Sequence, residues 1–432
     1  MEMVGRFENI SKQATRIFRN RGFSGMIQRR PTIVEIARKA GVSTGTVSHV
    51  MNQTARVRPP TRKKVDDAIL AISYLSRPYD PVDGRISRRD PDHAGSLTCP
   101  RLVSVGYISV DYTARVEVMP HREDRISARH IGKALGGPAA NVAVCAAALG
   151  GDFQIDVDLA TALGSDVDSQ WALEELARKN VRALPIRTPS NGHLSRCFII
   201  VEANGCRTII NEPFELSEAD LPVQLASDPC GRPRCLHMEG YHVDGMQGTL
   251  LDYRKHGWKL SLQTTGLPSA YHTRNSFGVL LTLFDIIFVN AELGREITKC
   301  RPSFSAIREA FCEMLKTITD RGIVILTLGE SGAVVFDVGD DAGVHIAAMA
   351  VDVVDATGAG DAFCGSFLGV WLKSSNLYLA AQYGAVAGGL AVTAEGAQGH
   401  IANAAEIQDV LAQLAWLPLV QGATERALRT GT

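Results

Sequence analysis

Long apolar runs are missing from this chain of 432 residues. No stretch approaches the roughly 18 consecutive apolar residues that a helix needs to cross a bilayer. The first 30 residues are basic but contain no apolar core segment, so they do not have the pattern of a secretory signal. Hydrophobic residues make up 45% and charged residues 21%, which is typical of a globular protein. We therefore expect a cytoplasmic protein, and its length predicts two or more domains.

Cysteines with the spacing of a metal site are also missing. The nine cysteines are scattered along the chain, and Cys230 and Cys235 are the two closest in sequence. An odd number of scattered thiols suits a reducing compartment. The loop Gly-x-x-x-x-Gly-Lys-Ser/Thr does not occur either, which argues against a P-loop nucleotide site.

The net charge of −1 hides an uneven distribution of charge. Residues 1–100 contain 18 basic and 9 acidic residues, whereas residues 101–432 contain 27 basic and 37 acidic residues. The basic excess is not confined to the N-terminal tail, because residues 31–80 still contain 8 basic and 4 acidic residues. This split predicts a basic module for an acidic partner, joined to an acidic body.

Residues 32–79 have the pattern of a small helical domain. Thr32 can cap a first helix that ends at Gly41, and a short turn leads to a second helix. A third helix follows Pro59-Pro60. The apolar residues at helical spacing are Ile33, Ile36, Ala37, Ala40, Val47, Val50, Val65, Ile69, Leu70 and Ile72. Two helices joined by a short glycine turn form a helix-turn-helix.

This segment resembles the DNA-binding headpiece of lactose-repressor-type (LacI) regulators. The resemblance rests on Thr32–Ser43 and Thr46–Asn52 and continues to Tyr74. It implies that the second helix reads the major groove of double-stranded DNA through its early residues. The residues that it assigns to DNA binding are Ser43, Thr44, Thr46, Ser48, His49, Asn52 and Arg62. A relic headpiece that folds without binding DNA is the alternative.

After a linker rich in proline, glycine and alternating charges, apolar runs alternate with stretches of helical pattern. The first run, Leu102–Ile108, predicts a buried strand, and later apolar runs are Cys235–Glu239, Ile286–Asn290 and Ile323–Leu328. This alternation predicts an α/β fold with a doubly wound, mainly parallel sheet. His193–Ile210 differs, because it has the pattern of a hairpin around Asn204-Gly205. The predicted organisation is a basic tail (1–31), a helix-turn-helix domain (32–79), a linker (80–100), an α/β domain (101–415) and a C-terminal tail (416–432).

The stretch Val354–Gly365 contains the turn Gly358-Ala359-Gly360 between an apolar run and a run that can form a helix. Backbone N–H groups at a helix start form an anion site, and glycine lets a phosphate approach them closely. Asp361 falls on the first turn of this helix. A bound anion would repel a carboxylate at this position, so the presence of Asp361 needs a functional reason. Taking the proton of an attacking hydroxyl is such a reason. An ordinary capped strand-to-helix turn is the alternative.

Two motifs resemble those of the ribokinase-type (PfkB) sugar and nucleoside kinases. Asp355–Phe363 is similar to the C-terminal signature of that family, and Gly136–Ala143 to its upstream signature. The resemblance implies a ribokinase-like fold with a small β-lid, to which the hairpin at His193–Ile210 belongs. It also implies phosphoryl transfer from ATP with Mg²⁺ to a sugar hydroxyl. Asp361 is then the base, and Gly358, Ala359 and Gly360 hold the phosphoryl group.

The same resemblance assigns further residues to the site. Those assigned to the sugar are Asp111, Gly136, Gly137 and Asn141, and those assigned to the nucleotide are Asn290, Thr327, Gly329 and Gly332. From the residues alone, tight packing of the glycines, a solvated loop aspartate and a plain β-turn after Thr327 are the alternatives. Asp355 and Thr357 match positions that bind a monovalent cation such as K⁺ in several relatives, although Asp355 also suits a brace for the turn.

One position departs from the family pattern. Leu293 stands where the family has a glutamate that places Mg²⁺ and phosphates through water, and Glu292 precedes it by one residue. Glu292 or Glu296 is the substitute that the sequence offers. The departure casts doubt on catalytic efficiency.

Two hypotheses of different class follow. The first is an ATP-dependent sugar kinase whose headpiece couples it to transcription. The second is a sugar-sensing transcriptional regulator whose kinase fold is weak or inactive as a catalyst. A kinase with a vestigial headpiece is a third. We also expect a homodimer, because it would pair two headpieces on a two-fold operator.

Overall fold

The computed structural model divides the chain into two compact units, residues 1–91 and 92–432. The residues that it describes are 37–38, 40–52, 57–58, 61, 64–65, 99–187, 189–203, 206–214, 216, 221, 231–244, 246–299, 304–318, 322–337 and 343–414. The predicted tails (1–31 and 416–432), nearly all of the predicted linker, and Arg62 lie outside these residues. Within the described residues, no helix is long and apolar enough to cross a membrane.

The first unit contains the helix that was expected after the Gly41 turn, α3 (Thr44–Asn52). Gly41 has a φ of 66°, the left-handed conformation that ends a preceding helix. The Ser43 hydroxyl accepts the Thr46 N–H at 3.1 Å and so caps α3. The buried core of this unit consists of Ala37, Ala40, Val47, Val50 and Val65. Five of the predicted apolar positions therefore meet, as a helix-turn-helix requires.

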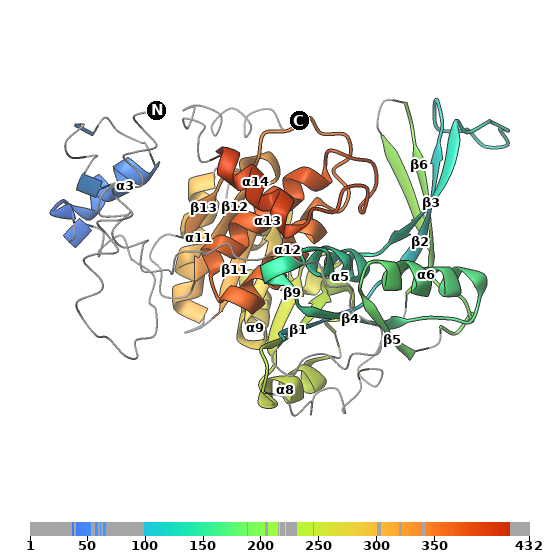
Figure 1. Cartoon of the computed structure of the whole chain (residues 1–432), viewed down its shortest axis with the longest axis horizontal. Coiled ribbons are helices and arrows are strands. Elements are labelled where there is room, and N and C mark those ends of the chain that lie inside the picture. The colour runs from blue at the N-terminus through green and yellow to red at the C-terminus, as the bar shows by residue number, and fades with distance from the viewer. Residues whose placement is uncertain are drawn as a thin grey trace. The chain divides into compact units, whose positions relative to one another are not determined.

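The second unit is built on a nine-stranded sheet (Figure 1). Its strands are β1 (Arg101–Val105), β4 (Asp156–Ala162), β5 (Arg182–Arg187), β8 (Arg234–Glu239), β9 (Lys259–Gln263), β10 (Ile286–Asn290), β11 (Ile323–Thr327), β12 (Ala333–Asp337) and β13 (Val344–Ile346). Their order is β13-β12-β11-β10-β9-β8-β1-β4-β5. The strands from β11 to β5 are parallel, and β12 and β13 extend the sheet in antiparallel fashion.

Helices cover both faces of this sheet. One apolar core packs one face against α5 (Pro138–Ala148), α6 (Val167–Arg178), α12 (Ala359–Ser374), α13 (Leu377–Ala391) and α14 (Ala404–Leu414). The other packs the opposite face against α8 (Gln247–Lys255), α9 (Arg274–Leu283), α10 (Ala291–Thr298) and α11 (Phe304–Ile318). Short 3₁₀ turns are η1 (Gly151–Phe153), η3 (Gly240–His242), η4 (Ser269–Tyr271) and η5 (Gly329–Ser331). Neighbouring residues of a strand enter different cores, as Leu102 and Val103 do, so the predicted doubly wound fold is confirmed.

A separate four-stranded sheet projects from the main one as a lid, seen at the right of Figure 1. Its strands are β2 (Ser109–Arg115), β3 (His130–Gly136), β6 (Arg196–Val201) and β7 (Arg207–Asn211), in the order β3-β2-β6-β7. β6 and β7 are antiparallel partners, which confirms the predicted hairpin. Its predicted tip, Asn204-Gly205, lies outside the described residues.

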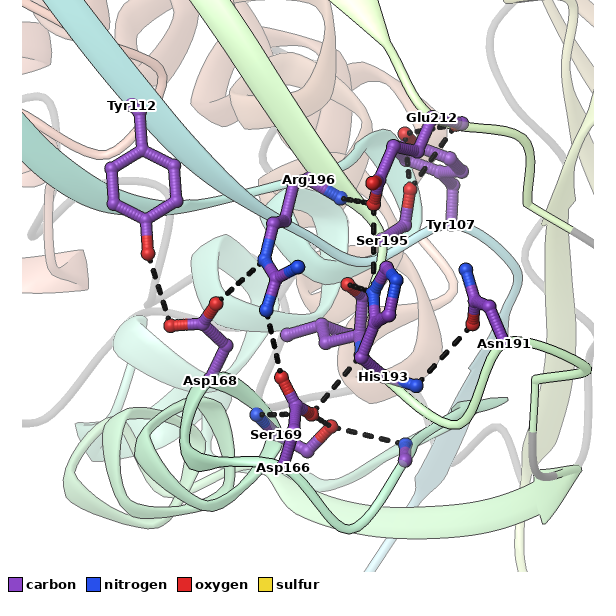
Figure 2. Close-up of polar contacts among 12 residues, drawn as sticks. Tyr107, Tyr112, Asp166, Asp168, Ser169, Asn191, His193, Ser195, Arg196 and Glu212 are labelled. Atoms are coloured by element: carbon purple, nitrogen blue, oxygen red, sulfur yellow. Dashed lines mark hydrogen bonds and ion pairs between the residues drawn. The ribbon is translucent and has the colours of Figure 1, made fainter.

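Charged groups hold the base of the lid to the first turn of α6. Asp168 accepts hydrogen bonds from Tyr112 (3.0 Å), Lys133 (2.9 Å) and Arg196 (2.8 Å), one from each of β2, β3 and β6. Figure 2 shows Arg196 between Asp168 and Asp166, the N-cap of α6. Burial alone raises the pKa of Asp168, but the hydrogen bonds from these three groups lower it overall. The lid is thus anchored through one carboxylate that joins three strands.

Candidate active site

The predicted glycine turn forms the N-terminus of α12. Gly358 caps the helix with a φ of 78°, and a Cβ there would lie 2.6 Å from the Cα of Ala397. The first helical hydrogen bond runs from Ala362 N–H to Gly358 O at 2.8 Å, so the helix itself leaves the N–H groups of residues 359–361 unused. Gly360 is exposed. The turn therefore has the donors and the access that a phosphate needs.

Asp361 lies on this first turn, 9% exposed, and is held by two amides. Asn141 on α5 donates to one carboxylate oxygen at 2.8 Å, and Gln263 at the end of β9 donates to the other at 2.8 Å. Burial raises the pKa of Asp361 to about 6, against the lowering effect of these hydrogen bonds. Gln398 in turn donates to the oxygen of Asn141 at 2.9 Å. The structure thus brings together Asn141 and Asp361, predicted from separate motifs 220 residues apart.

Asp111 lies within lid strand β2 and not in the solvated loop that the sequence offered as an alternative. Its register partner on β3 is Ala134, and its carboxylate lies close to the diagonal neighbour Gly136, where a Cβ would come 2.1 Å from it. Gly137 has a φ of 97°, and a Cβ there would meet the carbonyl oxygen of Tyr107 at 2.4 Å. Burial raises the pKa of Asp111, although the Ser109 hydroxyl, 2.6 Å away, lowers it. Gly136 is therefore needed for close packing against Asp111 and Gly137 for close packing against the Tyr107 backbone, so the packing alternative accounts for both glycines as well.

Sequence reasoning missed Glu239, the last residue of β8. Its side chain is 1% exposed, and one oxygen accepts the Tyr107 N–H at 2.8 Å. Gly106 makes room for it, since a Cβ there would lie 2.0 Å from the carboxylate. The signal that could have found Glu239 and Gln263 is their place at the ends of β8 and β9, because open α/β sheets bind ligands at the carboxyl ends of their strands. Gln398 lies in a loop, and no sequence signal singles it out.

Several buried acceptor atoms in this region have no partner within the described residues. They are one carboxylate oxygen of Glu239 and the amide oxygens of Gln263 and Gln398. Gln263 and Glu239 are cross-strand neighbours, and Gln263 and Gln398 are linked through Asp361 and Asn141. Buried acceptors without a partner are costly, so a ligand with several hydroxyl donors would satisfy them.

Asp355 and Thr357 lie just before the glycine turn. One Asp355 oxygen accepts the Thr357 N–H at 2.7 Å, and the other accepts the Gly396 N–H at 3.0 Å. The guanidinium of Arg207 on lid strand β7 is 2.7 Å from Asp355 and also donates to the Thr357 hydroxyl. Burial alone raises the pKa of Asp355, but the hydrogen bonds and the charge of Arg207 lower it overall. These contacts fit the brace that the sequence offered as one alternative for Asp355.

The residues assigned to the nucleotide lie along the neighbouring strand ends. Asn290 and Thr327 are register partners on β10 and β11. The Asn290 side chain caps α10 by accepting the Leu293 N–H at 2.8 Å. Gly329 and Gly332 form the turn between β11 and β12, and both have positive φ, of 57° and 87°. This geometry also fits a plain turn, so the nucleotide role stays a prediction.

Leu293 is buried in the apolar core between α10 and the sheet. Its position is therefore explained by packing, and the metal-placing carboxylate has no counterpart there. Glu292 is exposed on the first turn of α10, while the carboxylate of Glu296 lies 2.6 Å from His272. Both side chains are exposed, but Glu296 is paired with His272, so Glu292 is the better of the two predicted substitutes. Because Mg²⁺ keeps several waters and is held largely by substrate phosphates, a single exposed carboxylate suits it.

The described headpiece residues assigned to DNA lie on α3 and directly before it. Ser43, Thr44 and His49 are exposed, whereas Val47 and Val50 of the same helix are buried. Thr46 and Ser48 are half-buried, and Asn52 is the last residue of α3. Ser43 is engaged in capping, so its hydroxyl also serves the fold. The helix thus presents the polar face that a reading helix needs.

Comparison with known proteins identifies the second unit. The model of the pfkB family of carbohydrate kinases matches residues 100–404, most of the chain. The chain belongs to this family. Its second unit is therefore a carbohydrate kinase domain, a phosphotransferase with an alcohol group as acceptor. The ATP-dependent ribose-1-phosphate kinase of Halopiger xanaduensis is 25% identical over 299 residues, which cover 69% of this chain and 94% of that protein.

The fold of the kinase domain is shared with solved ribokinases. The structure of Arabidopsis thaliana ribokinase complexed with ribose and ATP matches with a TM-score of 0.59 and 21% identity. The match covers 73% of this chain and 99% of that one. The predicted ribokinase-like fold is confirmed.

The first unit has relatives of its own. Residues 32–76 match the model of the bacterial regulatory proteins of the lacI family. The HTH-type transcriptional repressor PurR of Mannheimia succiniciproducens is 54% identical over 43 residues, 10% of this chain and 13% of that protein. The chain thus joins a lacI-type headpiece to a pfkB-type kinase, as the two motif sets predicted.

Proposed function

We propose that the protein transfers the γ-phosphoryl group of ATP to a hydroxyl of a sugar. The observation that carries this proposal is the setting of Asp361, a buried carboxylate with a raised pKa beside the helix N-terminus. Asp361 accepts the proton of the attacking hydroxyl, and the N–H groups at the start of α12 stabilise the charge on the transferring phosphoryl group. The two amides on Asp361 hold its carboxylate in one orientation.

The unpartnered acceptors support a polyol as the second substrate. Glu239, Gln263 and Gln398 can each accept a hydrogen bond from a sugar hydroxyl through an oxygen that has no partner within the described residues. Asp111 can accept one through the carboxylate oxygen that does not bind Ser109. Asn141 is less available, because its amide already joins Asp361 to Gln398. We therefore assign Asn141 to positioning Asp361, and the four acceptors to the sugar. Tyr107, whose N–H donates to Glu239, is in edge-to-face contact with Phe214 at 4.8 Å.

The nucleotide lies by this proposal at the ends of β10 and β11, against Asn290, Thr327, Gly329 and Gly332. The solved ribokinase that carries ATP supports the choice of nucleotide by its shared fold. Mg²⁺ enters with the nucleotide and neutralises phosphate charge, with Glu292 as its partner through water.

We further propose that the headpiece binds an operator, so that the state of the kinase domain reaches a promoter. Such a protein works in the cytoplasm, where ATP and DNA are both present. Specific binding to duplexes selected from a random pool tests the headpiece, with Val47→Asp as the control that disrupts its core. Equal binding by wild type and this variant would show that the headpiece does not read DNA.

A homodimer through the lid would present two headpieces. Phe198 and Ile210 are register partners on the lid face opposite to that of Asp111, and Ile131 lies on the same outer face. These three side chains are 55%, 59% and 67% exposed. Exposed apolar groups gathered on a sheet face indicate an interface, and a second copy offers the same surface.

The sensor hypothesis keeps one specific observation in its favour, the burial of Leu293 in the core. A screen of ADP release over a panel of sugars separates it from the kinase hypothesis. Turnover on any sugar supports a kinase. Sugar binding by calorimetry without ADP release would favour the sensor.

A further inference from the structure

Two lid arginines face the loops that support the glycine turn. Arg115 on β2, Val201 on β6 and Arg207 on β7 form one row across the lid sheet. Asp111 lies four residues before Arg115 on the same strand, so this row is on the lid face that carries Asp111. Both guanidinium groups thus come from the inner face of the lid.

The two arginines contact two segments that meet at Asp355. Arg207 is 2.7 Å from Asp355 and donates to the Thr357 hydroxyl. Arg115 is 2.6 Å from Glu395, the neighbour of Gly396, whose N–H donates to Asp355. The Arg207 side chain is 28% exposed and that of Asp355 is 16% exposed. This ion pair is therefore screened from solvent more than a surface pair.

The residues predicted to hold K⁺ do not fit that ion in this arrangement. Both oxygens of Asp355 are already engaged, one by Thr357 and Arg207 and the other by Gly396. The Thr357 hydroxyl also accepts from Arg207. An additional cation there would face a like charge at contact distance, and like charges in a partly buried site repel strongly.

We propose that Arg207 takes the place of a monovalent cation at the phosphoryl-transfer turn. Its guanidinium neutralises Asp355 and fixes Thr357, the residue directly before Gly358. Arg207 is thus a positioning residue, which acts on the N–H groups of the turn through Asp355 and Thr357. A guanidinium suits the task, because it remains charged and can donate to two acceptors at once. The turn is then braced by the lid, and no K⁺ is required. This inference rests on the proposed function in one respect, that the turn binds the phosphoryl group of the nucleotide.

The test compares the full-length wild type with Arg207→Met in KCl and in choline chloride at equal ionic strength. Thallium NMR reports direct binding of Tl⁺, which substitutes for K⁺, and calorimetry reports the affinity for a non-hydrolysable ATP analogue with Mg²⁺. Arg207→Lys keeps the charge. Arg129→Met is the matched control, since Arg129 belongs to the lid region and forms an exposed ion pair with Glu117.

We expect no Tl⁺ site at Asp355 in the wild type and the same nucleotide affinity in both salts. Arg207→Met should gain a Tl⁺ signal, and its nucleotide affinity should fall about tenfold in choline chloride and recover in KCl, because loss of a charge-assisted contact is of that size. Arg207→Lys should stay close to wild type in choline chloride, and Arg129→Met should match wild type in both salts.

Three results would overturn the proposal. The first is saturable Tl⁺ binding at this site in the wild type, or a rise of about fivefold or more in its nucleotide affinity with K⁺. The second is an Arg207→Met protein that equals wild type in both salts. The third is a loss in Arg207→Met that KCl does not restore, which would show a structural role alone. If the wild type binds no nucleotide at all, the proposed function fails, while the Tl⁺ measurement still decides the role of Arg207.

Discussion

At the scale of single residues, the account depends on Asp361. Burial raises the pKa of its carboxyl to about 6, and a base acts only when it is deprotonated. We expect kcat/KM to rise with pH and to level off above an apparent pKa of about 6. A steady-state pH profile on an accepted sugar measures this. A profile that is flat from pH 5 to about 8 would contradict the assignment.

The same pKa shift has a consequence for stability. Because the folded state binds the proton of Asp361 more tightly than the unfolded state, protonation below the raised pKa stabilises the fold and the charged form costs stability above it. Asp361→Asn should therefore not lower the melting temperature at neutral pH, because it removes a buried charge. Its turnover should fall by a factor on the order of 10² to 10⁴, because the base is lost. Asp352→Asn, at an exposed position before the turn, is the control and should leave both unchanged.

The two glycines of the turn are expected to respond differently to alanine. A Cβ at Gly360 meets only the Gln263 amide at 3.7 Å, so Gly360→Ala should leave stability unchanged or raise it by up to about 1 kcal/mol. Its turnover should still fall on the order of a hundredfold, because the methyl group lies where a phosphate approaches. Gly358→Ala should destabilise the fold by about 1–3 kcal/mol, since its φ is 78° and Ala397 is in the way.

Urea unfolding and steady-state kinetics on both variants check this pair. Full activity of Gly360→Ala would mean that no ligand approaches the turn.

Contiguous motifs were enough to select residues that the structure then brings together. Asn141 and Asp361 were each selected within a glycine-containing signature, and the structure joins them. Arg207 was missed because its contact with Thr357 spans 150 residues and lies outside both signatures. The K⁺ expectation failed to include it for the same reason. Side chains supplied by another sheet leave no local pattern.

At the scale of elements, apolar runs were sufficient to predict most of the central strands. β8, β10 and β11 differ from the predicted runs by at most one residue at an end, because buried parallel strands read as continuous apolar segments. The first predicted run, residues 102–108, was too long. It ends at Val105, since Gly106 takes a φ of 140° to accommodate Glu239 and the chain then enters the lid.

The attachment of the lid makes an element-scale prediction. Asp168→Ala removes the acceptor shared by three lid strands. The free energy of unfolding of the kinase domain should therefore fall by about 1–3 kcal/mol at neutral pH. Because the pKa of Asp168 is lowered in the fold, this contribution exists above pH of about 4 and is lost as pH falls further. Urea unfolding at two pH values measures it. Glu174→Ala, exposed on the same helix, is the control, and an equal loss there would contradict the role of Asp168.

At the scale of the whole molecule, two units with separate relatives are joined in one chain. Both were predictable, because each carries its own motif set and its own charge balance. The exact domain boundaries, the linker and the tails remain predictions from the sequence.

The proposed dimer is a prediction at this scale. Light scattering should give twice the chain mass for wild type and the chain mass for Phe198→Asp, because a buried charge without a partner is costly in an apolar interface. The control is Leu251→Asp, which changes a partly exposed apolar residue on α8, and this variant should remain a dimer. A wild-type monomer would remove the link between lid pairing and a two-fold operator.

The most direct test of the central claim is coupled ADP release from full-length protein over a panel of sugars, run in parallel with Asp361→Asn. The account predicts that at least one sugar raises ADP release well above the sugar-free rate, and that Asp361→Asn abolishes the increase while still binding that sugar. ADP release that no sugar stimulates, or full turnover by Asp361→Asn, would contradict it.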